Sequence, residues 1–210
     1  SQRAHTGNSG ANLAPDQVRE SPGQRPSAYG VLQTSYTSRR APWSCMLSDM
    51  SEPDPQYLKV HFRLEVEDDW PPASVESLWG IDRGAGTAEL ANTPFFVRGV
   101  AIGDVVETSV DEKGTRWAGK VVQPSQNCTI RLIVLRDGGS AAARQSVINA
   151  FHELGAGGEG IERFRMVSLD IPPEANLGKI KKLLHHGADQ EWWHMEEGCV
   201  TEAWRTTEFA

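Results

Sequence analysis

The sequence predicts an α+β protein, with a small barrel-like or rolled antiparallel sheet followed by a ferredoxin-like βαβαβ sandwich. Residues 58–126 contain short apolar runs separated by turns with Gly and with Asn92-Thr93-Pro94, a pattern typical of small β-domains. In residues 127–210, apolar runs alternate with segments of helical periodicity, as in α/β sandwiches. Residues 1–57 are poor in Leu, Ile, Val and Phe, so we expect a disordered extension that cannot bury enough apolar surface to offset chain entropy.

The β-rich part begins with a clear strand pattern. In Lys59–Val66 apolar and polar residues alternate, and a period of two is typical of a half-buried strand. Trp70-Pro71-Pro72 follows it, and proline cannot donate to a strand ladder. Further short strands are expected at Glu76–Asp82, Thr87–Asn92, Phe95–Val100, Asp104–Val110 and Arg116–Val122. The turn residues Asp111–Gly114 predict that the last two form a hairpin.

The C-terminal part opens with Ile130–Leu135, a continuous apolar run expected for a strand covered on both faces. Ser140 can cap a helix through Leu154, and a second helix follows Pro172-Pro173 and ends at Gly187. Strands are expected at Phe164–Ile171 and Glu191–Met195. Three glycines match the G-x-G-x-x-G pattern of dinucleotide sites, but they follow a helix and precede a strand, so we interpret them as a loop: Gly155, Gly157 and Gly160.

Composition excludes several classes of protein. The net charge of −7 argues against a general affinity for nucleic acid, which needs clustered Lys and Arg. The three cysteines are far apart and none forms a C-x-x-C pair, so we expect neither a disulfide framework nor a zinc site. No stretch approaches the length of a membrane span. We expect a cytoplasmic protein with no cofactor and no metal.

The candidates for catalysis lie on two predicted strands. In Trp192-Trp193-His194-Met195-Glu196-Glu197, alternate residues share a face, which places Trp192, His194 and Glu196 together. A His–Glu pair can transfer protons, and His61 on the first strand is a possible neighbour. The same residues also fit a structural role or a contact with a ligand or partner, and all three interpretations stay open.

A candidate binding patch surrounds Asn92-Thr93-Pro94-Phe95-Phe96. The two phenylalanines point to opposite sides of the chain, so one fills the core and the other faces outward. Glu76 and Trp79 can flank Phe96 on the outer side, where an aromatic ring beside a carboxylate forms a contact surface. Pure packing is the alternative. The candidate binding residues are Glu76, Trp79, Phe96 and Trp192.

Several of these segments together resemble a bacterial family, the domain of unknown function DUF4265, over roughly residues 58–200. The resemblance lies in Glu76–Trp79, Asn92–Phe96, Gly103–Val106 and the strand Thr129–Leu135. It implies continuity of fold and a bacterial cytosolic origin, and it brings no established activity. The C-terminal half is also distantly similar to the ferredoxin-like regulator of ribonuclease activity B family, through Phe164–Pro172 and the Trp192-Trp193 strand.

Three hypotheses for function remain at this point. We favour a non-catalytic protein-binding or regulatory module of an immunity-like kind, because an acidic face can complement a basic protein partner. A hydrolase-type enzyme with its site around His194 and Glu196 is the alternative. A nucleic-acid-associated regulator is the third, and it requires a shared basic face formed by Lys179, Lys181, Lys182 and Arg144.

Overall fold

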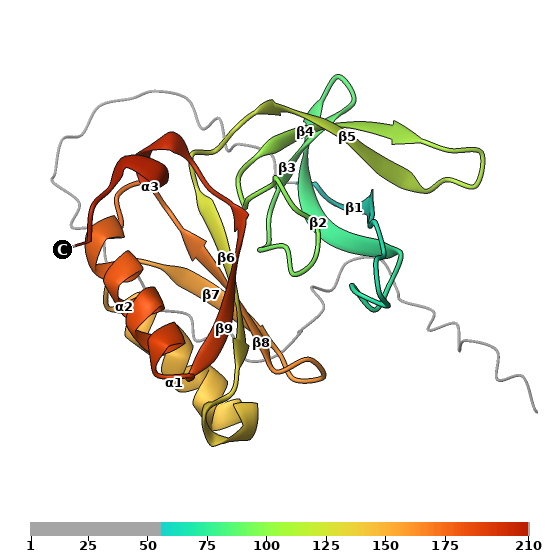
Figure 1. Cartoon of the computed structure of the whole chain (residues 1–210). Helices are drawn as coiled ribbons and strands as arrows, with labels where there is room; N and C mark the ends of the chain where they lie inside the picture. Colours follow the sequence, from blue (N-terminus) through green and yellow to red (C-terminus); the bar gives the residue numbers. More distant parts are fainter. Residues whose placement is uncertain (1–55, 210) are drawn as a thin grey trace, which may run out of the picture. The chain divides into compact units, whose positions relative to one another are not determined.

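The computed structural model describes residues 56–209, which lie within one compact unit. The extension expected over residues 1–57 therefore falls almost entirely outside the described part, and Cys45 does as well. The described chain is a mixed α/β structure, with a closed five-stranded barrel followed by a four-stranded sheet and a few helices (Figure 1). None of its helices is long and apolar enough to cross a membrane.

The barrel is formed by five strands. They are β1 (Tyr57–Arg63), β2 (Val75–Gly84), β3 (Thr87–Leu90), β4 (Val105–Val110) and β5 (Arg116–Gln123). Neighbouring strands pair antiparallel, and a parallel pairing of His61 with Trp117 closes the barrel between β1 and β5. The predicted hairpin of β4 and β5 is confirmed. Alternate residues fill the interior: Val60, Phe62, Leu78, Ala88, Leu90, Val100 and Val106.

The first strand is shorter than the alternating pattern predicts. It ends at Arg63, and Val66 is exposed, because the chain turns back on itself between Glu67 and Trp70. The two residues inside this turn, Asp68 and Asp69, have φ angles of 49° and 62°. Aspartate tolerates this left-handed region better than most residues, so the polar pair favours the turn over a longer strand.

The strand expected at Phe95–Val100 does not form, and this prediction is wrong. The chain between β3 and β4 is irregular because a side chain takes up its backbone donors. The Glu76 carboxylate accepts hydrogen bonds from the backbone N–H groups of Phe95, Phe96 and Val97, at 2.7, 2.9 and 2.7 Å. A carboxylate that takes three consecutive N–H groups curls the backbone around itself, which is incompatible with a strand ladder.

The four-stranded sheet has the order β7-β8-β6-β9, with every neighbouring pair antiparallel. Its elements follow the chain order β6 (Cys128–Val134), α1 (Ala141–His152), β7 (Gly157–Ile161), β8 (Met166–Ile171), α2 (Leu177–Asp189) and β9 (Trp193–Cys199). A short 3-10 helix, η1 (Arg136–Gly139), precedes α1, and α3 (Glu202–Thr206) follows β9. The arrangement is therefore βαββαβ, with one strand more than predicted.

The additional strand is β7, which contains two of the three glycines interpreted as a loop, Gly157 and Gly160. It lies at the edge of the sheet beside β8, close under α1. A Cβ atom at Gly158 would come within 3.1 Å of the Leu169 side chain and 3.2 Å of the Ser168 carbonyl oxygen. Close packing therefore favours glycine here, and a glycine-rich strand lacks the apolar alternation by which strands are recognised in a sequence.

Helices α1 and α2 lie together on one face of this sheet (Figure 1). Ser140 caps α1 by accepting a hydrogen bond from the Ala143 N–H, as predicted. Helix α2 does not end at Gly187 but continues to Asp189. A glycine stands at this helical position because the Trp193 indole packs directly on it and leaves no room for a side chain. The core between helices and sheet includes Ile130, Leu132, Phe151, Leu169, Ile171, Ile180, Leu184, Trp193 and Trp204.

The opposite face of the sheet is covered by the irregular segment 93–101 of the barrel. Ser168 Oγ donates to the Pro94 carbonyl at 2.7 Å, and Thr129 Oγ1 donates to the Val100 carbonyl at 3.3 Å. The Gly99 N–H donates to the Gly198 carbonyl on β9 at 2.8 Å. Polar side chains on this face are thus paired with backbone carbonyl groups of the barrel, which ties the two sheets together.

Candidate ligand-binding pocket

A pocket of about 480 Å³ opens where the barrel meets this second face of the sheet. Three parts of the chain form it: the connection from β1 to β2, the irregular segment after β3, and the central strands of the sheet. The lining residues are Arg63, Leu64, Glu65, Glu67, Asp68, Trp70, Pro71, Phe95, Phe96, Val97, Arg98, Arg131 and Glu196. Volumes of this size are typical of small-molecule sites.

A row of polar residues crosses the sheet beneath the segment 93–101. Glu159 on β7 pairs with Ser168 on β8, Ser168 pairs with Arg131 on β6, and Arg131 pairs with Glu196 on β9. Directly paired residues of antiparallel strands share a face, so all four point away from α1 and α2. Arg131 and Glu196, at one end of this row, are the part of the sheet that lines the pocket.

Arg131 is the most unusual of these residues because it is only 3% exposed. Its Nη1 donates to the Val97 carbonyl at 3.3 Å, whereas Nε and Nη2 find no hydrogen-bond acceptor among the described residues. Burial lowers the pKa of the guanidinium, and the Glu196 carboxylate opposes this shift. An arginine nevertheless stays charged in proteins, so the pocket contains a cation whose hydrogen-bonding capacity is incompletely used.

Glu196 is held between two arginines. Its Oε1 accepts from Arg98 Nε at 2.7 Å and lies 2.6 Å from Arg98 Nη2. Its Oε2 lies 3.2 Å from Arg131 Nε, close enough for charge attraction but without the alignment of a hydrogen bond. One carboxylate therefore faces two guanidinium groups, and this cluster of Arg98, Arg131 and Glu196 has a net positive charge.

Gly198 makes room for the buried guanidinium. A Cβ atom at this position would lie 2.7 Å from Arg131 Nη2 and 2.9 Å from its Nε. Real Cβ atoms do not approach so closely, so any other residue at 198 would displace the Arg131 side chain or the strand.

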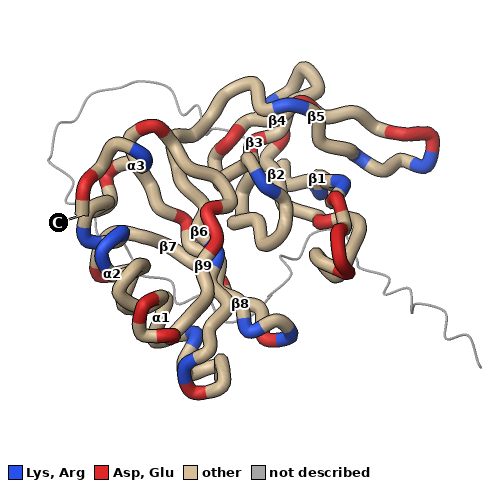
Figure 2. The backbone as a smooth tube through the Cα atoms, in the orientation of Figure 1, with Lys and Arg blue, Asp and Glu red and all other residues tan. Residues whose placement is uncertain are grey.

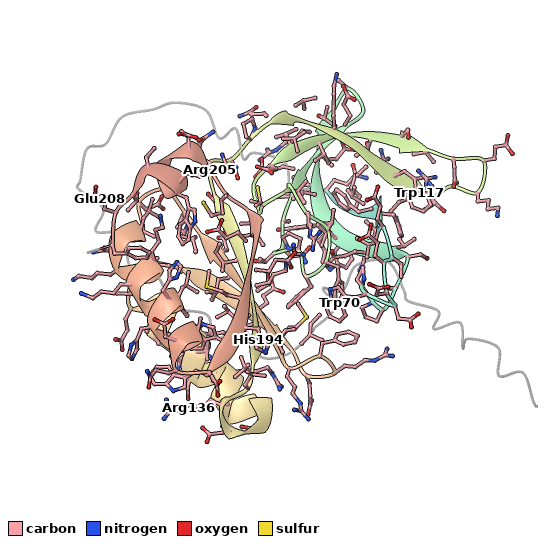
Figure 3. The ribbon with its side chains drawn as sticks, in the orientation of Figure 1. Trp70, Trp117, Arg136, His194, Arg205 and Glu208 are labelled. Atoms are coloured by element: carbon pink, nitrogen blue, oxygen red, sulfur yellow. The ribbon has the colours of Figure 1, made fainter. Side chains whose placement is uncertain are left out.

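The aromatic part of the pocket comes from the barrel. Trp70 contacts Phe96 edge-on, with ring centroids 5.7 Å apart, and both contact Phe164 in the same way, at 6.2 and 5.6 Å. Edge-to-face contacts of this kind stabilise aromatic clusters. Trp70 is 41% exposed and lies on the connection between β1 and β2 (Figure 3), so part of its ring surface remains free for a ligand.

The rim of the pocket is acidic. Glu65, Glu67 and Asp68 line it from the connection between β1 and β2, where acidic residues are concentrated (Figure 2). Glu67 and Trp70 exchange two backbone hydrogen bonds, at 2.8 and 2.9 Å, which fixes the turn that presents these carboxylates beside the tryptophan. The pocket thus has a buried cation, Arg131, at its floor and an acidic rim.

Of the four residues predicted to bind, Phe96 lines the pocket and the other three do not. Glu76 is buried at 9% exposure, and it shapes the segment that carries Phe96. Trp79 is three residues away along the same strand and therefore points to the opposite face, where Lys59 Nζ lies 4.1 Å from the centre of its ring. Trp192 packs against His186 near the end of α2.

The three residues considered for catalysis are not brought together by hydrogen bonds. His61 Nδ1 lies 3.1 Å from the Arg116 carbonyl, and its ring packs against Trp117 on β5. His194 is exposed on β9 (Figure 3), while Glu196 belongs to the arginine cluster. Among these candidates, only Glu196 lines the pocket.

The basic residues of the nucleic-acid hypothesis do not form a free surface. Arg144 is buried at 8% exposure, and its Nη1 donates to the Gly139 carbonyl at 2.6 Å. Lys181 Nζ donates to the carbonyl groups of Trp204 and Thr207, at 3.0 and 2.7 Å. Two of the four cations therefore serve to hold backbone groups at helix ends. In the described part of the chain, no group of three or more His, Cys, Asp or Glu residues is arranged to hold a metal.

Two carboxylates with raised pKa values lie elsewhere on the same face of the sheet. Burial raises the pKa of Asp170 to about 6, against an opposing hydrogen bond from Asn127 Nδ2 at 2.8 Å. Burial also raises the pKa of Glu159, and a hydrogen bond from the Thr93 backbone opposes that shift. Neither residue lines the pocket.

The sequence interpretation missed the residues that dominate the pocket, Trp70, Arg98 and Arg131. Arg131 lies within the apolar run Ile130–Leu135, which the sequence analysis interprets only as a buried strand. A single charged residue inside such a run is itself a signal, because a fully buried arginine is rare without a partner. Arg98 and Trp70 come from irregular connections, which a pattern of alternation does not describe.

The barrel, the four-stranded sheet and its helices define a mixed α/β protein with two sheets. The chain belongs to the family "Domain of unknown function (DUF4265)", whose model matches residues 76–195. This range includes Phe96, Arg98 and Arg131.

Among solved structures, the chain is similar to a hypothetical protein from Neisseria gonorrhoeae, whose published description is "Novel crystal structure of a hypothetical protein". The two share 19% sequence identity with a TM-score of 0.56, over 69% of this chain and 96% of the other. At this identity the likeness shows the fold alone. No curated protein matches the chain.

Proposed function

We propose that this protein is a non-catalytic binding module that holds a small carboxylate-bearing ligand in the pocket between the barrel and the sheet. The observation behind the proposal is Arg131, a buried cation at the floor of the pocket with two nitrogen atoms that have no hydrogen-bond partner. The sequence predicts a binding module whose contact surface lies on the outside of the barrel. The proposal keeps the binding module and places its contact in the pocket.

The Arg131 guanidinium is costly to bury without hydrogen-bond acceptors, and a carboxylate ligand would supply them. An unsatisfied buried donor costs about 1–3 kcal/mol, and more when the group is charged. A carboxylate matches the guanidinium fork and can accept two parallel hydrogen bonds. Glu196 does not satisfy Arg131 in this way, because Arg98 holds its other oxygen atom. Both unpaired nitrogen atoms are covered in this structure, so a ligand carboxylate would complete the cluster only after the side chains around Arg131 shift to admit it.

The composition of the lining supports binding over catalysis. The lining contains aromatic rings, arginines and carboxylates. Within residues 56–209, no Ser, Cys, His, Lys or Tyr lines this pocket. Those absent types supply most enzyme nucleophiles and the imidazole of general acid–base catalysis. Arginines and aromatic rings hold and orient a ligand without reacting with it.

The test is a titration of the protein, labelled with ¹⁵N-arginine, with sodium benzoate, followed by NMR of the arginine Nε–H signals. Benzoate combines a carboxylate with an aromatic ring. We expect a saturable shift of the Arg131 signal and little change at Arg83, which forms an exposed ion pair with Glu89 on the barrel.

The matched variants are Arg131→Met and Arg83→Met, each checked for folding by circular dichroism. Benzoate binding should disappear in the first and persist in the second. A wild-type Arg131 signal that does not move at any benzoate concentration would refute the proposal.

Four finer assignments accompany this proposal without supporting it. We propose that the C-terminal half is the ferredoxin-like sandwich expected from the sequence, because α1 crosses from β6 to β7 and α2 crosses from β8 to β9 in a sheet of the order β7-β8-β6-β9. The weaker resemblance to the regulator of ribonuclease activity B family, the protein partner and the cytoplasmic location stay predictions.

A further inference from the structure

The charge of the pocket points to a more specific ligand class. Resting on the function proposed above, we infer that the ligand is a zwitterion, an α-amino acid with an apolar side chain, whose ammonium group faces the acidic rim while its carboxylate faces Arg131.

The count of charges argues against a simple anion as the best ligand. The lining contributes three arginines and four carboxylates, so its formal charge is −1. A purely anionic ligand would gain from Arg98 and Arg131 but would be repelled by the rim. A ligand with both charges, correctly oriented, is attracted by both ends of the pocket.

The rim offers a suitable place for a cation. Glu67 and Asp68 belong to the turn that also carries Trp70, and all three line the pocket. An ammonium group is attracted both by carboxylates and by the negative face of an indole ring. The edge-on contact with Phe96 fixes the Trp70 ring, so this part of the site is formed before the ligand arrives.

The apolar lining accounts for the remaining part of the ligand. Phe95, Phe96, Val97 and Pro71 belong to the same lining as the acidic rim and the arginines. An amino acid bound across the pocket would place its side chain against these residues. The volume of about 480 Å³ accommodates an amino acid as large as phenylalanine.

Three probes with the same phenyl group separate the charge contributions: L-phenylalanine, 3-phenylpropanoate without the ammonium group, and L-phenylalaninamide without the carboxylate. Binding of each is followed by NMR of the Arg131 Nε–H signal and by calorimetry. We expect L-phenylalanine to bind about tenfold more tightly than 3-phenylpropanoate, a difference of about 1.4 kcal/mol. L-phenylalaninamide should bind most weakly, because it leaves Arg131 unpaired.

The double variant Glu67→Gln/Asp68→Asn tests the rim. It should abolish the preference for L-phenylalanine while 3-phenylpropanoate binds at least as tightly as before. Glu112→Gln is the matched control, because Glu112 is exposed in the turn between β4 and β5 and does not line the pocket. This control should leave both affinities unchanged.

The possible outcomes distinguish this inference from the proposed function. If 3-phenylpropanoate binds as tightly as L-phenylalanine, or if the rim variant leaves their ratio unchanged, the zwitterion inference is overturned while carboxylate binding stands. If none of the three probes moves the Arg131 signal, carboxylate binding and the zwitterion inference both fail.

Discussion

Replacement of Glu76 by glutamine should destabilise the protein strongly, although the two residues have the same shape. The carboxylate accepts one backbone N–H at Oε1, from Phe95, and two at Oε2, from Phe96 and Val97. A glutamine amide has a single oxygen, so its NH₂ group must face at least one of these donors. In the better orientation the oxygen faces Phe96 and Val97, and the hydrogen bond to Phe95 is lost.

The size of the effect follows from this count. A hydrogen bond to a charged group contributes about 1.5–3 kcal/mol, and the Phe95 N–H would remain buried without an acceptor. The two surviving bonds also weaken when the charge is removed. We therefore expect Glu76→Gln to lower the free energy of unfolding by about 2–4 kcal/mol.

The assay is urea unfolding monitored by far-UV circular dichroism and by tryptophan fluorescence. Glu107→Gln is the control, because Glu107 is half exposed and lies 3.3 Å from Lys120 in a surface ion pair worth less than about 1 kcal/mol. If Glu76→Gln costs no more than Glu107→Gln, the carboxylate does not organise the segment after β3, and our account of the missing strand fails.

Two further predictions follow from buried titratable groups. The pKa of Asp170 is raised to about 6 in the folded protein, so its ionisation lowers the free energy of unfolding as the pH rises from about 4 to 6. Asp170→Asn should remove this loss and stabilise the protein by about 1–2 kcal/mol at pH 7. Urea unfolding at pH 4 and pH 7 measures the difference. An equal effect at both pH values would contradict this. Burial raises the pKa of the Cys199 thiol to about 11, so a disulfide reagent at pH 8 should modify it far more slowly in the folded protein than in urea; equal rates would contradict it.

The sequence predicts the regular part of this fold well, because half-buried strands and amphipathic helices leave a period that can be read directly. The alternation in β1, the hairpin of β4 and β5, and the Ser140 cap of α1 are examples. Where one interaction overrides the pattern, the prediction fails. Glu76 converts an apolar stretch into an irregular segment, and the glycines of β7 conceal a strand because they carry no side chains to alternate.

The candidate pocket was less accessible to sequence reasoning than the fold. Phe96 and Glu196 were selected as candidates, but the row that joins Glu196 to Arg131 depends on the register between β9 and β6, which local patterns do not specify. The acidic rim depends on a turn in which Asp68 and Asp69 adopt left-handed backbone angles. Both features arise from long-range pairing or from irregular backbone.

The segment 93–101 also determines how the protein unfolds. Its carbonyl groups accept hydrogen bonds from Thr129, Arg131 and Ser168, three buried polar side chains of the sheet. A fragment beginning at residue 127 would leave these groups without their acceptors and would lose the cover over half of its sheet. The barrel and the sheet are therefore expected to melt in a single cooperative transition, and neither half is suited to be expressed alone.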